Sequence, residues 1–74
     1  MTNDQLRQAL RELNGERHLA VVFHGVHSLA LGSVYLEIKH AMLVPQEEDH
    51  LVKVTDGKSI YIIDAAQVAW LKIG

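Results

Sequence analysis

The chain has 74 residues, enough for one small domain and too few for two. Hydrophobic residues make up 49% of it and charged residues 22%, a composition typical of globular rather than disordered chains. Nine acidic and seven basic side chains give a net charge of −2, whereas domains that mainly bind nucleic acid are usually basic. The absence of cysteine excludes a disulfide and a cysteine-ligated zinc site.

The short length predicts self-association. A core built from fewer than ~70–80 residues seldom yields more than ~3–5 kcal/mol of net stability, so a further source of stability is expected. The polar N-terminal segment and the lack of cysteine predict a cytoplasmic protein. Charged and histidine side chains interrupt the most apolar region, residues 19–44, so no membrane span is expected.

Residues 3–14 are predicted to form a short amphipathic helix. Apolar side chains recur there at the helical spacing i, i+3, i+4 and i+7: Leu6, Ala9, Leu10 and Leu13. One of Thr2, Asn3 and Asp4 would cap the start, and Gly15 would end the helix. The opposite face, with Arg7, Arg11 and Glu12, is expected to be solvated.

The remainder, residues 18–74, reads as strand. Residues 18–24 form a first strand that ends at Gly25, and a long second strand extends from residue 28 to 44. The apolar parity of this second strand changes at Gly32, which predicts a bend. A break near Lys39 and His40 is the alternative, and we prefer a single strand.

Three more strands complete the predicted fold. A polar loop at residues 45–49 leads to a strand at 50–55, and Asp56-Gly57 predicts a two-residue type I′ hairpin turn to a strand at 59–63. A short helical turn begun by Asp64 then precedes the last strand, residues 68–73. The expected fold is mainly β: one domain over residues 1–74, a five-stranded, strongly bent antiparallel small barrel with a short N-terminal helix.

The last two strands are apolar on both faces, whereas a strand with one wet face alternates polar and apolar residues. A single short chain cannot cover both faces, so one face is expected to contact another subunit. The residues proposed for this oligomer interface are Tyr61, Ile63, Leu71 and Ile73.

The pattern resembles the Sm and Sm-like proteins, including the bacterial Hfq branch. The similarity lies in HLAVVFHG (residues 18–25), in SLALGSV (28–34) and in HLVKVTDGKSIYIIDAAQVAWLKI (50–73). It implies a bent barrel that assembles into a homo-oligomeric ring, the fourth strand of one subunit pairing with the fifth strand of the next. It also implies binding of single-stranded RNA at the pore, for which the candidate residues are His24, Gly25, His27, Lys53 and Lys58.

Two departures from that family support an alternative. Ile63-Asp64 stands where Hfq proteins carry a basic residue and a histidine, and the loop at residues 45–49 contains three acids. The alternative is an SH3-like protein-interaction or structural oligomer with no nucleic-acid role. DNA is not an expected partner of either.

Neither a catalytic site nor a metal site is expected. His24 and His27 are close in sequence, but a zinc site needs three or four ligands, so a metal-binding oligomer is the least favoured reading. No phosphate-binding glycine motif or nucleophile elbow is present. We therefore expect no enzyme, no metal and no cofactor.

Overall fold

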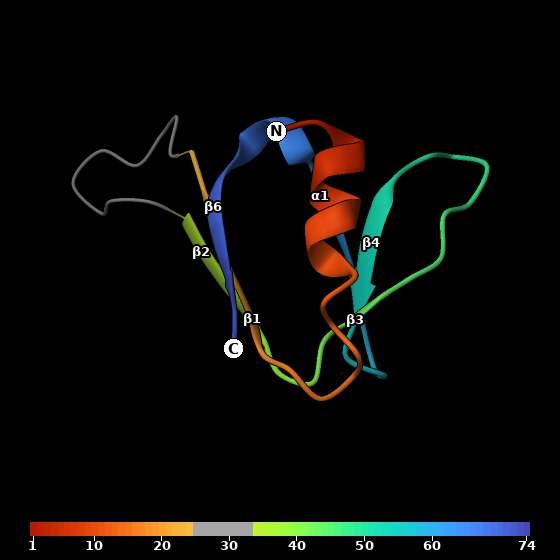
Figure 1. The fold of residues 1–74 in the computed structure, drawn as a ribbon, viewed down its shortest axis with the longest axis vertical. Coiled ribbons are helices and arrows are strands. Elements are labelled where there is room, and N and C mark those ends of the chain that lie inside the picture. The colour runs from red at the N-terminus through yellow and green to blue at the C-terminus, as the bar shows by residue number, and fades with distance from the viewer. Residues whose placement is uncertain (25–33) are drawn as a thin grey trace.

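The structure is a computed structural model, and it describes residues 1–24 and 34–74 (Figure 1). Its elements in chain order are α1 (Asn3–Leu10), β1 (Leu19–Phe23), β2 (Val34–Ile38), β3 (Met42–Leu43), β4 (Val52–Thr55), β5 (Ile60–Ile63), the 3-10 turn η2 (Ala65–Gln67) and β6 (Val68–Ile73). The prediction of a mainly β chain with one short N-terminal helix is confirmed.

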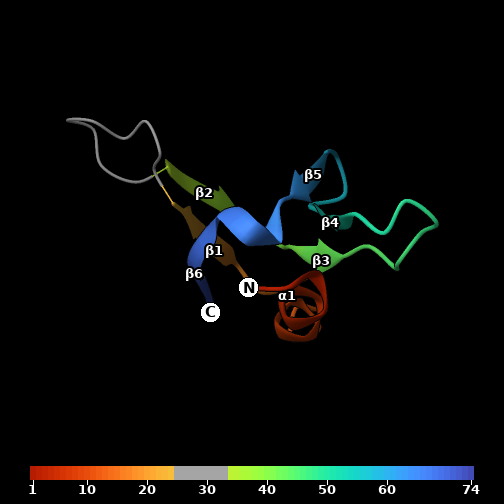
Figure 2. The ribbon, with the colours of Figure 1, turned by 90° about the horizontal axis from the view of Figure 1, so that it is seen from above.

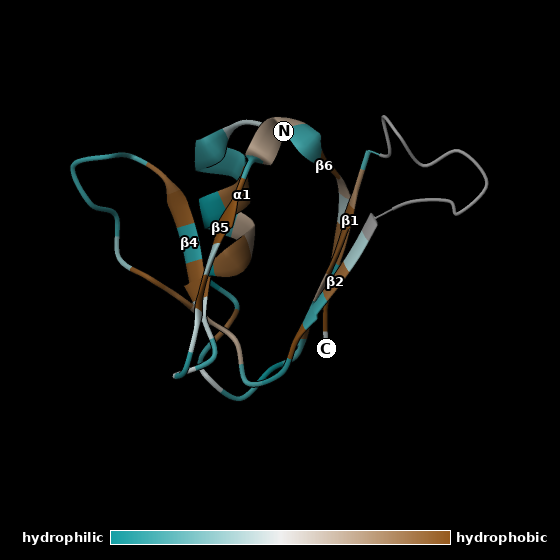
Figure 3. Ribbon diagram, turned by 180° about the vertical axis from the view of Figure 1, so that it is seen from behind, coloured by the Kyte–Doolittle hydropathy of each residue, from teal (hydrophilic) through white to brown (hydrophobic). Residues whose placement is uncertain are grey.

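The described strands form two antiparallel sheets of three strands each, in the orders β2-β1-β6 and β3-β4-β5. The sheets converge where β2 leads into β3 and splay apart toward η2 (Figures 1 and 3). Helix α1 packs against β3, β4 and η2, and the view from above shows it beside β3 (Figure 2). Buried apolar side chains from both sheets and the helix make one core, which includes Leu6, Leu10, Leu19, Val21, Ile38, Val52, Val54 and Val68.

The prediction of five strands in a small barrel is corrected on two points: the described residues contain six strands, and these do not close into a barrel. The preferred single strand over residues 28–44 breaks at Lys39 and His40. His40 has φ +53°, a left-handed conformation that ends β2 and directs the chain into β3 of the other sheet. The predicted bend at Gly32 lies outside the described residues.

The N-terminal helix is shorter than the predicted range. It begins at the capping box formed by Thr2 and Gln5, and its α-helical part ends at Leu10. The backbone then tightens, with the Leu13 N–H donating to the Leu10 carbonyl at 3.0 Å, and this turn keeps Leu13 in the core. The expectation that Arg7 faces solvent is wrong, since only 6% of it is exposed.

The hairpin between β4 and β5 is confirmed, but the two-residue type I′ turn is wrong. Thr55 pairs with Ile60, so four residues connect the strands, and of these only Gly57 has a positive φ, +93°. The Asp56 carboxylate accepts hydrogen bonds from the N–H groups of Lys58 and Ser59, both at 2.8 Å. The connection is longer than a two-residue turn because these bonds to the Asp56 side chain replace the backbone pairing that a tighter turn would make.

Candidate assembly interface

Strand β6 has one open edge within the described part of the chain. It pairs with β1 alone, and just beyond its end His18 and Gly74 exchange both backbone hydrogen bonds, at 3.0 and 3.1 Å. Hydrogen-bonded pairs alternate along an antiparallel ladder, so Lys72 also directs its backbone groups toward β1. The N–H and C=O groups of Leu71 and Ile73 therefore face the open edge.

Strand β5 also has an open edge, because it pairs with β4 alone among the described strands. The Val44 N–H donates to the Lys53 carbonyl at 2.9 Å, so the backbone groups of Lys53 face β3. Those of Val52 and Val54 then face β5, where their partners in register are Ile63 and Tyr61. The N–H and C=O groups of Ile60 and Ile62 consequently face outward.

The β5 edge lacks the features that usually protect an edge strand. Proteins commonly block such edges with charged residues, proline or a bulge, whereas the β5 strand is IYII. Its two exposed side chains are large and apolar, Ile60 at 63% and Ile62 at 60% exposed. A second strand could pair here without displacing any part of the described chain.

The structure places the four predicted interface residues in two different settings. Leu71 and Ile73 lie on β6 with their backbone at the open edge and their side chains half-buried. Tyr61 and Ile63 instead direct their backbone toward β4, and Ile63 is part of the core, 3% exposed. On β5 the residues at the open edge are thus Ile60 and Ile62.

The sequence of β4 indicates which residues of β5 are buried. Val52 and Val54 alternate with Lys53 and Thr55, which indicates which face of β4 is buried. Residues directly opposite each other across an antiparallel pair share a face. The alternation in β4 therefore places Ile63 and Tyr61, which lie opposite Val52 and Val54, on the core side of the sheet.

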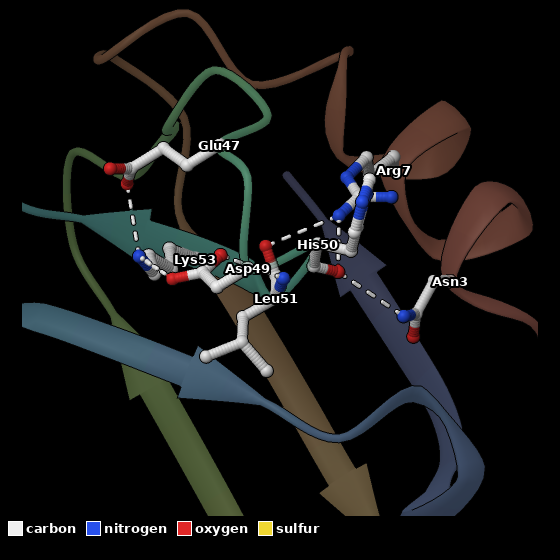
Figure 4. Close-up of polar contacts among 7 residues, drawn as sticks. All are labelled: Asn3, Arg7, Glu47, Asp49, His50, Leu51 and Lys53. Atoms are coloured by element: carbon white, nitrogen blue, oxygen red, sulfur yellow. Dashed lines mark hydrogen bonds and ion pairs between the residues drawn. The ribbon is translucent and has the colours of Figure 1, made fainter.

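The structure describes three of the five candidate RNA-binding residues: His24, Lys53 and Lys58. His24 is exposed, and its N–H donates to the Gln67 carbonyl at 2.7 Å. Lys58 is exposed in the hairpin, while Gly25 and His27 lie outside the described residues. Lys53 contacts two carboxylates (Figure 4), so its charge is already balanced within the chain.

The ion pairs of Lys53 involve the acidic loop before β4. Its Nζ lies 2.7 Å from an Asp49 carboxylate oxygen and 3.0 Å from one of Glu47. Hydrogen bonds to Asp49 and then to Glu47 raise the pKa of Lys53. The bond from Lys53, followed by one from the Leu51 N–H, lowers the pKa of Asp49. Both groups therefore stay ionised over a wider pH range than free side chains.

The same loop is held from the helix side by Arg7 (Figure 4). Its Nη2 donates to the carbonyl oxygens of His50 at 2.6 Å and Leu51 at 3.2 Å. Asn3 adds a hydrogen bond from Nδ2 to the His50 carbonyl at 3.3 Å. These donors hold His50 in a left-handed conformation, φ +58°. Arg7 thus fixes the loop rather than facing solvent.

Comparison with known proteins leaves the chain without a match. No family model, no curated protein and no solved structure matches it.

Within residues 1–24 and 34–74, no three His, Asp or Glu side chains are grouped so that they could hold a metal ion. Of the histidines, His18 and His40 lie together, with ring centroids 5.7 Å apart in an edge-to-face arrangement. No helix in the described ranges has the length and apolarity needed to cross a bilayer.

Proposed function

We propose that the chain is a small Sm-like protein that assembles with copies of itself and acts as a cytoplasmic, non-catalytic scaffold. One observation carries the proposal: within the described residues, β5 and β6 each present an unpaired edge, with the backbone groups of Ile60 and Ile62 on one and those of Leu71 and Ile73 on the other. An antiparallel pairing of β5 with β6 of the next copy satisfies both edges.

This pairing joins two different surfaces, so it is a head-to-tail contact. Head-to-tail contacts generate a ring when the rotation between copies closes and a filament when it does not. Pairing also removes water from Ile60 and Ile62, and burial of apolar surface contributes roughly 25 cal/mol per Å². Assembly therefore supplies the stability that a core of this size lacks.

Binding of RNA is the less supported version of the proposal. Phosphate binding requires cations that are free to displace counterions, whereas the Lys53 side chain is 14% exposed and its ammonium group contacts two carboxylates. We therefore propose a scaffold whose assembly does not depend on RNA. Salt-sensitive filter binding of U-rich or A-rich single strands, lost in Lys58→Glu, would favour the RNA version instead.

The assembly is tested by a proline on the β5 edge. The Ile62 N–H faces outward, so Ile62→Pro removes an edge donor without removing a hydrogen bond to β4. Ile62→Thr is the matched control, because it keeps the N–H and the β-branched shape. Light scattering coupled to gel filtration should give an oligomer for the unmodified and Thr proteins and a folded protein of lower mass for the Pro protein. A monomeric unmodified protein at micromolar concentration would overturn the proposal, and so would a folded Pro variant that keeps the oligomeric mass.

A further inference from the structure

The outer face of the β2-β1-β6 sheet carries two rows of side chains across the three strands. In one row Ala20 pairs with Glu37 on one side and Lys72 on the other. In the next row Val22 pairs with Tyr35 and Trp70. Leu19 and Val21 are buried in the core, so both rows lie on the side away from it.

The aromatic row is unusually exposed for its size. Tyr35 is 57% and Trp70 is 54% exposed, whereas Val22, which lies between them in register, is only 7% exposed. In the charged row the small Ala20 leaves a hollow of about 230 Å³, whose lining includes Tyr35, Glu37 and Lys72. Large amphipathic rings beside a hollow are features of protein interfaces.

The two charges of this face are not used inside the described chain. Glu37 and Lys72 form no ion pair there, with each other or with another side chain. The Tyr35 hydroxyl donates to Glu37 Oε2 at 2.9 Å, which orients the carboxylate but leaves its charge. The face thus presents one anion, Glu37 on β2, and one cation, Lys72 on β6, and both are level with Ala20 of β1.

We propose that this face packs against the same face of a second copy. A two-fold axis that runs along β1 places β2 of one copy over β6 of the other. Glu37 then lies opposite Lys72 of the second copy, and Tyr35 lies opposite its Trp70. The small Ala20 lies over its own counterpart, where it allows the sheets to approach. Under this two-fold rotation, each row lies against the same row of the second copy and complements it, as a symmetric dimer contact requires.

The charge arrangement favours a second copy over nucleic acid. A phosphate chain laid on the face would meet Glu37 as well as Lys72, whereas a second copy pairs both charges. The contact uses a sheet face and not the β5 or β6 edge, so it does not depend on edge assembly. Three strands of five residues span roughly 14 by 17 Å, a small interface that predicts weak association in the micromolar range or above.

The test is a charge reversal in which two variants are mixed. Glu37→Lys alone places Lys opposite Lys, and Lys72→Glu alone places Glu opposite Glu. Mixed together, the two proteins restore both opposite-charge pairs. Ile62→Pro is included in both, so that edge assembly does not contribute. Sedimentation equilibrium should show that each variant dimerises more weakly than its parent, and that the mixture forms a heterodimer at least about tenfold tighter than either alone.

The matched control is the pair Glu48→Lys and Lys58→Glu, which changes the net charges equally at exposed positions off this face. Mixing the control pair should give no gain. The proposal is overturned if the face variants keep the parent's affinity, or if mixing them raises the affinity no more than mixing the control pair does.

If the Ile62→Pro proteins do not fold, the same charge reversals are made without this substitution, and energy transfer between labelled populations measures their mixing. More transfer for the face pair than for the control pair supports the proposal, and equal transfer overturns it. Charge complementation together with no edge assembly in the unmodified protein would refute only the proposed function.

Discussion

Arg7 shows how one buried side chain sets the conformation of a loop more than forty residues away in sequence. Its guanidinium satisfies the carbonyl oxygens of His50 and Leu51, and Lys53 anchors the opposite side of the same loop through Asp49 and Glu47. The helical periodicity gives no sign of this role, because a charged residue beside an apolar stripe usually faces water. Only the tertiary position of the loop explains its burial.

Replacing Arg7 by methionine should destabilise the fold. Arg7→Met keeps the apolar stem but leaves the Leu51 carbonyl without its donor and the His50 carbonyl with only the longer bond from Asn3. The expected loss is about 1–3 kcal/mol in the free energy of unfolding. Arg11→Met, on the exposed side of the same helical segment, should stay within about 0.5 kcal/mol. Urea denaturation measures both. Equal effects of the two changes would contradict the role assigned to Arg7.

Acid should weaken the fold partly through Asp56. Hydrogen bonds from the N–H groups of Ser59 and Lys58 lower the pKa of Asp56. A carboxyl group with a lowered pKa in the folded state stabilises it above the unfolded pKa, about 4, and this stabilisation is lost as the pH falls through the folded value. Asp56→Asn keeps a side-chain oxygen acceptor but does not titrate.

The urea midpoint of Asp56→Asn should consequently fall less between neutral and acid pH than that of the unmodified protein. Glu48→Gln, at an exposed loop position, is the control and should fall as the unmodified protein does. An Asp56→Asn protein with an unchanged acid profile would exclude this contribution.

At the scale of the elements, sequence patterns predicted the helix, the first strand and the last three strands, because each has a clear period or turn signal. They did not predict the break between β2 and β3, since His40 takes the left-handed conformation that Gly or Asn more often marks. They also missed the length of the hairpin, which depends on side-chain hydrogen bonds of Asp56 rather than on the Asp-Gly pair.

The hairpin itself depends on Gly57. Its φ of +93° is a conformation that side chains with a Cβ rarely adopt, and a β-branched residue resists it most. Gly57→Val should lower the free energy of unfolding by about 1–2 kcal/mol or more. Lys58→Val, the next position along, should cost much less. Thermal unfolding compares the two, and a Gly57→Val protein as stable as Lys58→Val would require a different turn.

At the scale of the whole molecule, the two sheets splay around a single short helix (Figure 3). Among the described residues, the border strands β5 and β6 each pair on one side only. The apolar excess of the last two strands predicted a need for assembly. It could not predict which residues face a neighbour, because both faces of each strand are apolar and only the pairing with β4 and β1 separates them. Edge pairing and face pairing use different surfaces, so one copy can make both contacts.

Amide hydrogen exchange at Ile62 and Leu71, read by NMR in the native protein, tests the edge pairing most directly. Their N–H groups have no partner among the described residues of a single copy and are hydrogen-bonded in the proposed assembly. The N–H groups of Tyr61 and Lys72 are bonded within the chain in either case. Edge assembly predicts that Ile62 and Leu71 are protected to the same degree as Tyr61 and Lys72. Rapid exchange at Ile62 and Leu71 beside protected Tyr61 and Lys72 would show that the edges stay open.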